Sequence, residues 1–325
     1  MSLLLGVVAK AQTAATGTRG SRPSIIFMMS DDQSWNGLSV SMHPQLDAKS
    51  RVVQTPTLQR LARQGMCFSD AYAPAPVCAA TRISLQTGKS PAILHWTKAA
   101  KSVGAADGYK MIPPVNIRSI SERETTFAEL LQRSGYRTAH YGKWHIQGGG
   151  PGRHGYDAHD GNIGNEYAAR FTDPNPVDIF GMARRAAGFM AESQKAGKPF
   201  FIQLSWHALH APENALKKTL AKYQGQGGKD GGKKAGRAAI AEDLDTGVGM
   251  VLDALDDLGL DDSTYVIYTS DNGGGGGGGG ARLNGGKGSL YEGGIRVPLI
   301  VRGPGIKAGS FCAVPVMGVD WFPTF

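Results

Sequence analysis

Two short polar pairs in the chain, Asp31-Asp32 and Asp271-Asn272, carry oxygen atoms that could bind a metal ion. Carboxylates packed close together repel one another unless a cation neutralises them. Ligation by oxygen alone suits a hard ion such as calcium or magnesium better than zinc. Each pair alone fits a helix cap or the start of a turn. Because both pairs directly follow apolar runs, the two together favour a metal site.

A cysteine in the segment 76–88 is the candidate nucleophile. If a helix begins near Cys78, then Arg82 lies one turn further on the same face. A positive charge and a helix N-terminus both stabilise an anionic group at such a position. Taken alone, a single cysteine is more often an inert, buried small side chain. With Cys67 and Cys312 it forms neither a disulfide framework nor a zinc site, and one bridge between Cys67 and Cys312 is left open.

Several cationic or imidazole side chains could bind an anion, and each has a simpler interpretation. Lys143 and His145 are two residues apart, so they point the same way on an extended backbone, although such a pair also fits a solvated strand end. His207 is interpreted as a core histidine or an outer partner of the site rather than as a direct participant. His210 follows it closely, and Lys287 lies in a glycine-rich loop where it could simply be exposed.

The elements that must position these residues alternate between strands and helices. Short apolar runs rich in β-forming residues predict five strands, at Ser24–Met29, Tyr136–Tyr141, Pro199–Ser205, Thr264–Thr269 and Val297–Val301. Helical apolar spacing predicts helices over Thr57–Arg63, Thr126–Gln132, Ile179–Met190 and Ala238–Leu258. This alternation predicts an α/β fold with a mostly parallel central sheet and helices on both faces. The nearly continuous apolar character of each run is typical of strands buried on both faces.

The candidate site residues follow four of these strands directly. Asp31 follows the first run, Lys143 the second, His207 the third and Asp271 the fourth. Ligands of open α/β sheets bind just beyond the carboxyl ends of the strands. The order of elements therefore predicts that these polar groups meet at one edge of the sheet, and this is the main physical argument for an active site.

The segment around Cys78 resembles the signature of the sulfatase family, Cys-x-Pro-x-Arg followed by Thr-Gly at the end of a helix. Cys78, Arg82 and Thr87-Gly88 match it, whereas Ala80 stands at the position of the usual proline. In that family the cysteine is oxidised after synthesis to formylglycine (3-oxoalanine). The resemblance therefore implies a formylglycine at position 78 and a formylglycine-generating enzyme as a partner during maturation. Because that enzyme reads this stretch as a linear motif, we expect Ala80 in place of proline to reduce the efficiency of the conversion.

Further segments resemble the family in its usual order along nearly the whole chain. These are Ser24–Asp32, Thr55–Gly65, Gly135–His145, Phe200–Pro212, Ser270–Gly273 and Gly285–Pro298. The resemblance implies a metal site of Asp31, Asp32, Asp271, Asn272 and residue 78, filled by calcium or else by magnesium or manganese. It also implies that Lys143, His145, His210 and Lys287 contact the nucleophile or the sulfate.

The resemblance implies hydrolysis of a sulfate ester, with an alcohol or phenol as the leaving group. A hydroxyl of the hydrated aldehyde would attack sulfur, Lys143 and Lys287 would stabilise the charge on the sulfuryl oxygens, and His210 would protonate the leaving oxygen. His145 would assist the release of sulfate, and Arg82 would hold residue 78 in place. The alternatives are a phosphodiesterase or phosphonate monoester hydrolase of the same alkaline-phosphatase-like superfamily, and a non-catalytic protein that binds anions or glycans.

The two ends of the chain carry separate expectations. Residues 1–22 contain the apolar stretch Leu3–Val8 followed by small residues, which resembles the end of a secretory signal and indicates export to the periplasm or beyond. The stretch is short and lacks a basic start, so a cytoplasmic location is the alternative. Residues 23–325 are expected to form the catalytic domain. Because family members usually continue into a small C-terminal sheet domain, the sequence is expected to lack that part.

Composition excludes several classes of function. The formal net charge of +8 fits an anionic substrate, but the basic residues are scattered and no nucleic-acid-binding motif is present. No stretch approaches the roughly 20 apolar residues of a membrane span. Two of the glycine-rich tracts, 227–236 and 273–280, predict surface loops. A small-molecule or glycan sulfate ester is therefore the expected partner.

Overall fold

The computed structural model describes residues 22–99, 108, 110–112, 114–225, 231–274 and 283–325, without the side chains of 231–234. Its strands are β1 (Ser24–Ser30), β2 (Met66–Phe68), β3 (Ala71–Tyr72), β4 (Arg137–Gly142), β5 (Ala158–His159), β6 (Phe200–Ser205), β7 (Thr264–Ser270), β8 (Leu299–Arg302), β9 (Ser310–Cys312) and β10 (Val316–Met317). Its α-helices are α1 (Pro56–Gln64), α2 (Cys78–Thr87), α3 (Phe127–Arg133), α4 (Asn165–Ala168), α5 (Ile179–Lys195), α6 (Lys217–Gln224), α7 (Gly231–Asp257), α8 (Glu292–Ile295) and α9 (Trp321–Thr324).

An eight-stranded sheet in the order β5-β4-β6-β1-β7-β8-β2-β9 forms the centre of the molecule. The strands from β5 to β7 all run parallel, whereas β8 is antiparallel to both β7 and β2. The five predicted strands correspond to β1, β4, β6, β7 and β8, with boundaries that differ by one or two residues. The predicted α/β fold with a mostly parallel sheet is confirmed.

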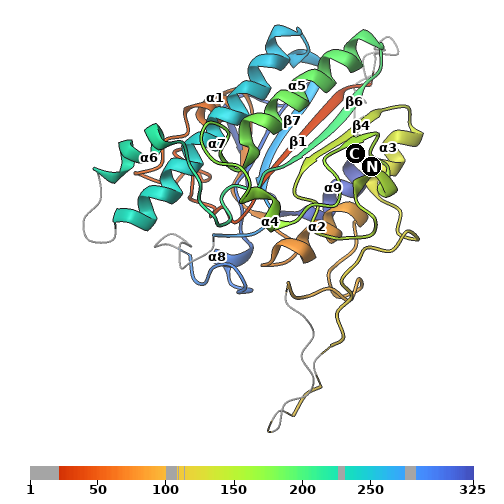
Figure 1. The fold of residues 1–325 in the computed structure, drawn as a ribbon, viewed down its shortest axis with the longest axis horizontal. Coiled ribbons are helices and arrows are strands. Elements are labelled where there is room, and N and C mark those ends of the chain that lie inside the picture. The colour runs from red at the N-terminus through yellow and green to blue at the C-terminus, as the bar shows by residue number, and fades with distance from the viewer. Residues whose placement is uncertain (1–21, 100–107, 109, 113, 226–230, 275–282) are drawn as a thin grey trace, which may run out of the picture.

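The central strands are apolar on both faces because helices cover both sides of the sheet. Every residue of β1 and of β6 is buried. Helices α1, α5 and α7 pack on one face around a core that includes Ile26 and Met28 of β1. Helices α2 and α3 and the short α9 lie on the other face, around Phe27 and Met29. Figure 1 shows α5 and α7 on one side of the sheet and α2 and α9 on the opposite side.

Some local expectations were wrong or fall outside the described residues. Helix α7 begins at Gly231, so the second half of the glycine-rich tract 227–236 is helical rather than a loop. Of the tract 273–280, the structure describes only the first two residues, and the signal-like stretch Leu3–Val8 lies outside the described residues altogether.

The three cysteines are free, so the open question of a disulfide is answered. Strands β2 and β9 pair in a register that sets Cys67 opposite Phe311 and Phe68 opposite Cys312. Because side chains alternate between the two faces of a sheet, Cys67 and Cys312 point to opposite faces. Within the described ranges, no helix is both long and apolar enough to cross a membrane.

Candidate active site

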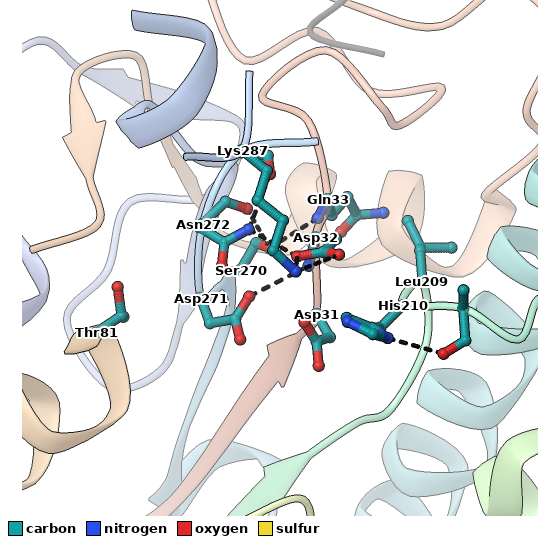
Figure 2. A network of polar contacts seen from close by, with 12 residues as sticks. Asp31, Asp32, Gln33, Thr81, Leu209, His210, Ser270, Asp271, Asn272 and Lys287 are labelled. Carbon is teal, nitrogen blue, oxygen red and sulfur yellow. Dashed lines mark hydrogen bonds and ion pairs between the residues drawn. The ribbon is translucent and has the colours of Figure 1, made fainter. Parts of the chain in front are cut away.

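The two acidic pairs meet because their strands are neighbours in the sheet. Strands β1 and β7 pair in parallel with Ser30 opposite Ser270, so the residues that follow them emerge side by side. The backbone N–H of Asp271 donates to the Ser30 carbonyl (3.0 Å), and the N–H of Asp32 donates to Oδ1 of Asp271 (3.1 Å). Figure 2 shows Asp31, Asp32, Asp271 and Asn272 gathered beyond the strand ends. Neither pair caps a helix.

These side chains fit a hard divalent cation. One oxygen from each of Asp31, Asp32 and Asp271 can be chosen so that all three lie within 4.8 Å of one another, and all three residues are buried. Asn272 joins them by donating from Nδ2 to Oδ1 of Asp32 (2.8 Å). Oδ1 of Asp31 and Oδ1 of Asn272 are buried and accept no hydrogen bond from any described residue. Buried acceptors are normally satisfied, and a metal ion would satisfy both.

Each carboxylate also faces a cation of the chain itself. Lys143 is fully buried and pairs with Asp31. Nζ of Lys287 lies 2.7 Å from Oδ1 of Asp32. The third carboxylate, that of Asp271, pairs with Arg82, whose Nη2 lies 2.8 Å from Oδ2 of Asp271. Three negative and three positive charges therefore compensate one another at the edge of the sheet.

The carboxyls of this cluster have pKa values that differ in direction. Burial alone would raise the pKa of Asp31, but the charges of Lys143 and Arg82 outweigh burial and hold that pKa well below its usual range. Burial and the neighbouring charge of Asp31 raise the pKa of Asp271 to about 7. The two groups compete for ionisation in one buried site, and a divalent ion would favour the charged form of both.

Cys78 begins helix α2, and Arg82 anchors that helix to the acidic cluster. Every residue of α2 is buried, and Cys78 is only 2% exposed. Besides pairing with Asp271, Arg82 donates from Nη1 to the carbonyl of Lys143 (2.6 Å). Burial raises the pKa of the Cys78 thiol, while Lys143 opposes this. An unmodified thiol here is therefore mostly protonated and is a poor nucleophile at neutral pH.

His145 and His210 approach the cluster from two other strand ends. His145 follows β4, adopts a positive φ of 64° and lines a small pocket with Ala79, the neighbour of Cys78. Burial and the charge of Lys143 lower the pKa of His145 to about 3, so its ring is neutral. Nδ1 of His210 lies 2.8 Å from the Ala211 carbonyl, and Figure 2 shows the ring beside Asp31.

His207 differs from the expected core histidine in its hydrogen bonding. The ring is 2% exposed and lies 6.1 Å from the ring of Tyr167, between centroids. Neither ring nitrogen has a hydrogen-bond partner among the described residues. Burial lowers its pKa to about 3. The ring is thus neutral and buried, as a packing residue would be, but its nitrogens are not satisfied.

Arg237 of helix α7 contacts two of the loops that carry site residues, and the sequence did not reveal it. Its Nη2 donates to the carbonyl of Asp32, and its Nη1 lies 3.4 Å from the carbonyl of Leu209, next to His210. Glu213 pairs with the same guanidinium at 3.3 Å. Arg237 lies in a segment rich in glycine and lysine, where no spacing or motif distinguishes it from a solvated residue.

The structure therefore brings the predicted site residues to one edge of the sheet. They come from the ends of β1, β4, β6 and β7, from the start of α2, and from the loop before α8: Asp31, Asp32, Cys78, Arg82, Lys143, His145, His210, Asp271, Asn272 and Lys287. Among the aromatic residues of these segments, Trp144 and Trp206 are buried, whereas Tyr291 is 63% exposed.

The family profile and the curated relatives that match this chain are sulfatases. The sequence profile of the sulfatases matches residues 23–325. The chain is 30% identical to N-acetylgalactosamine-6-sulfatase of Canis lupus familiaris, covering 94% of this chain and 62% of that protein. It is 28% identical to arylsulfatase A of Homo sapiens, covering 99% of this chain and 66% of that protein. The crystal structure of Ps i-CgsB in complex with k-i-k-neocarrahexaose superimposes with a TM-score of 0.79 at 25% identity, covering 94% and 71% of the two chains.

Proposed function

The chain belongs to the sulfatase family, and on that premise we propose that it hydrolyses sulfate esters at the cluster formed by Cys78 and the two acidic pairs. The chain spans 62% of the length of the first relative above, so the activity is a proposal for this chain in its own right. One observation carries it: a buried residue 78 lies at a helix N-terminus beside three carboxylates and three cations that come from distant parts of the sequence.

We propose that Asp31, Asp32, Asp271 and Asn272 hold a divalent ion together with residue 78, and that the ion is calcium. The unpartnered oxygens of Asp31 and Asn272 support a hard divalent cation, because oxygen-only ligation suits calcium or magnesium, and calcium is the choice that the resemblance to the sulfatases implies. When bound, such an ion supplies Lewis-acid stabilisation of negative charge on oxygen. Residue 78, once converted to formylglycine, supplies an aldehyde whose hydrate offers an oxygen nucleophile for sulfur.

Lys143 and Lys287 are assigned to the sulfate group. Their ammonium groups lie beside Asp31 and Asp32, at the edge where the substrate must meet residue 78. Cations fixed in a buried site stabilise the charge that accumulates on the sulfuryl oxygens without any reorganisation. Lys287 keeps 23% of its side chain exposed, whereas Lys143 is fully buried, so Lys287 is the one that can meet an arriving substrate first.

The two histidines are assigned to proton transfer, and Arg82 is assigned to hold residue 78 in position. His210 is partly exposed beside Asp31, and this supports its assignment as the group that protonates the departing oxygen of the ester. His145 carries an Nδ1 that is buried and unpartnered among the described residues, and this nitrogen is assigned to accept a proton as sulfate is released. Arg82 fixes the first turn of α2 to Asp271 and to the Lys143 carbonyl.

The substrate is proposed to be a sulfated glycan or a small aryl sulfate. The support is the likeness to N-acetylgalactosamine-6-sulfatase and to a structure that holds k-i-k-neocarrahexaose. A formylglycine-generating enzyme is the proposed maturation partner. Export is proposed from the apolar stretch Leu3–Val8, and appearance of the full-length gene product in the periplasmic or secreted fraction of its host would support it.

The decisive experiment combines mass spectrometry with turnover. The chain is produced with a formylglycine-generating enzyme, and the tryptic peptide that contains Cys78 is weighed. We expect the mass of an aldehyde, together with hydrolysis of 4-nitrophenyl sulfate. Cys78→Ala is expected to lower kcat at least about 10³-fold, as removal of a nucleophile does, with Cys312→Ala as the matched control.

Each contrary outcome points to a different alternative. Faster turnover of bis(4-nitrophenyl) phosphate or a phosphonate monoester than of the sulfate would identify a phosphoryl-transfer hydrolase of the same superfamily. An unconverted Cys78 in protein from the native host, with sulfated sugars still bound, would identify a binding protein. Full activity in Cys78→Ala would refute the assignment of the nucleophile.

A further inference from the structure

Next to the proposed catalytic centre is a small pocket to which no role has been given so far. It is lined by Ala79, Trp96, Ala99, Arg118, His145 and Gln147 and encloses about 220 Å³. Ala79 directly follows Cys78, and His145 lies two residues after Lys143. The pocket therefore shares its lining with α2 and the loop after β4, the two segments that also carry Cys78 and Lys143.

The size of the pocket limits what it can hold. Pockets that bury a whole ligand usually enclose about 300–1,000 Å³, so 220 Å³ accommodates only one part of a larger substrate. Sulfur must lie over residue 78 if the proposed function is right. The part of the substrate beside Ala79 is then the leaving group, which is the portion that distinguishes one sulfate ester from another.

The walls of the pocket combine an aromatic ring with an unpaired cation. Trp96 buries most of its ring in the core, with 5% of the residue exposed, and still lines the pocket. Arg118 is exposed and forms no ion pair or hydrogen bond through its guanidinium among the described residues. Several other arginines near the site do have acidic partners, for example Arg82 and Arg237. A free guanidinium in a pocket is suited to bind a carboxylate or sulfate with two hydrogen bonds.

We propose that this pocket is a subsite for a sugar of the leaving group, and that Arg118 pairs with a second anionic group on that sugar. The preferred substrate is then a glycan that carries at least two negative groups, the sulfate that is cleaved and a neighbouring carboxylate or sulfate. This inference rests on the proposed function, because it takes residue 78 as the position of sulfur.

The test compares substrates with one and with two anionic groups. Wild type, Arg118→Gln, Arg118→Lys and the control Arg123→Gln are assayed on N-acetylgalactosamine 6-sulfate and on a disaccharide that adds a uronate to it. A disulfated disaccharide distinguishes a carboxylate from a second sulfate as the favoured group. Arg123 is a suitable control because it is an exposed arginine close in sequence that does not line the pocket.

We expect wild type to prefer a two-anion substrate and Arg118→Gln to lower the ratio of the two kcat/KM values about 10- to 100-fold, as loss of one charged hydrogen-bonding pair does. The loss should lie mainly in KM, with partial rescue in Arg118→Lys and none of the effect in Arg123→Gln. An equal loss on both substrates, or no loss on either, would overturn the proposal.

Direct binding separates this inference from the proposed function. If no sulfate ester is hydrolysed, the proposed function fails, and calorimetric binding of the same sugars to unconverted protein still tests the subsite. Weaker binding of the two-anion sugar by Arg118→Gln than by wild type would support the subsite without any turnover. Equal binding by the two proteins would refute it.

Discussion

At the scale of single residues, the site is a set of charges that compensate one another in pairs. Asp31, Asp32 and Asp271 each have a different cation as their nearest partner, and the three cations come from α2, the loop after β4 and the loop before α8. Taking charges out of water is costly unless they are paired and hydrogen-bonded. The pairs differ in exposure, and this difference decides which residue can be changed without unfolding the protein.

Asp32→Ala is expected to abolish binding of calcium while leaving the fold intact. Removing an outer partner of a metal ligand already costs about 10- to 100-fold in affinity, so the loss of a direct ligand should cost more. The cation left behind, Lys287, is partly exposed and can be solvated. Isothermal titration with calcium measures the effect, and Asp262→Ala, at an exposed position, serves as the control.

Asp271→Ala would be a poorer choice for the same test. It removes the carboxylate that lies 2.8 Å from the buried Arg82 and leaves only Asp31 at 3.6 Å, and breaking a buried ion pair destabilises a protein by about 3–5 kcal/mol. Calcium affinity equal to wild type in the folded Asp32→Ala protein would contradict the proposed metal site.

At the scale of elements, helix α1 depends on helix α7 for its N-terminal cap. Thr55 precedes α1 but accepts no capping hydrogen bond through its side chain. Asp245 of α7 accepts hydrogen bonds instead, from the N–H of Thr57 (2.9 Å) and from the N–H of Leu58 (2.8 Å). The first-turn amides of one helix are therefore satisfied by a buried carboxylate of another, and this contact holds the two helices together on one face of the sheet.

Asp245→Ala is expected to lower the free energy of unfolding by about 2 kcal/mol, because two first-turn amides, one of them buried, lose their acceptor. Asp253→Ala on the same helix is the matched control. Its carboxylate pairs with Arg60 but is 64% exposed, so its loss should cost at most about 1 kcal/mol. Urea unfolding of both variants gives the comparison, and equal losses would show that the cap contributes nothing of its own.

The elements predicted correctly from sequence are those whose apolar pattern is local. Runs such as Ser24–Met29 are continuous because both faces of β1 are covered, and they could be found without any fold. The convergence of Asp31 and Asp271 was also predictable, because each directly follows a parallel strand. The short strands β2 and β9 were missed because three residues carry no measurable periodicity.

Site residues without a motif could not be predicted. Arg237 donates to the carbonyl of Asp32, and Arg118 lines a pocket. Both the contact and the pocket form only when the chain folds. The unsatisfied nitrogens of His207 likewise depend on which side chains surround the ring, which no spacing in the sequence records.

At the scale of the whole molecule, buried histidines couple stability to pH. Burial lowers the pKa of His140 and of His207 to about 3, from an ordinary value of 6.5. Between about pH 6.5 and pH 3, these histidines are therefore protonated in the unfolded chain and neutral in the folded chain. Above about pH 6.5 the rings are neutral in both states, and the free energy of unfolding is at its full value. It falls progressively as the pH drops below this, because only the unfolded chain takes up the protons.

The free energy of unfolding is expected to fall by about 1.4 kcal/mol per pH unit for each of these histidines below pH 6. His140→Gln should remove one such contribution, so its plot of stability against pH should be shallower than that of wild type by this amount. His140 lies between the rings of Trp144 and Tyr156, and its Nε2 is 3.2 Å from Oγ of Ser205. Urea unfolding from pH 7.5 to 4.5 measures both slopes, and parallel plots would contradict the buried, neutral state of His140.

The complete burial of α2 has a consequence for the order of events in the life of the protein. All ten residues from Cys78 to Thr87 are buried by other parts of the chain. A second enzyme therefore cannot bind this stretch in the folded protein. Any catalyst that is to alter the sulfur must meet the nascent chain, before the sheet and the C-terminal segment close over it. A chain that folds before modification keeps its thiol. The yield of modified protein would then depend on the rate of modification relative to the rate of folding.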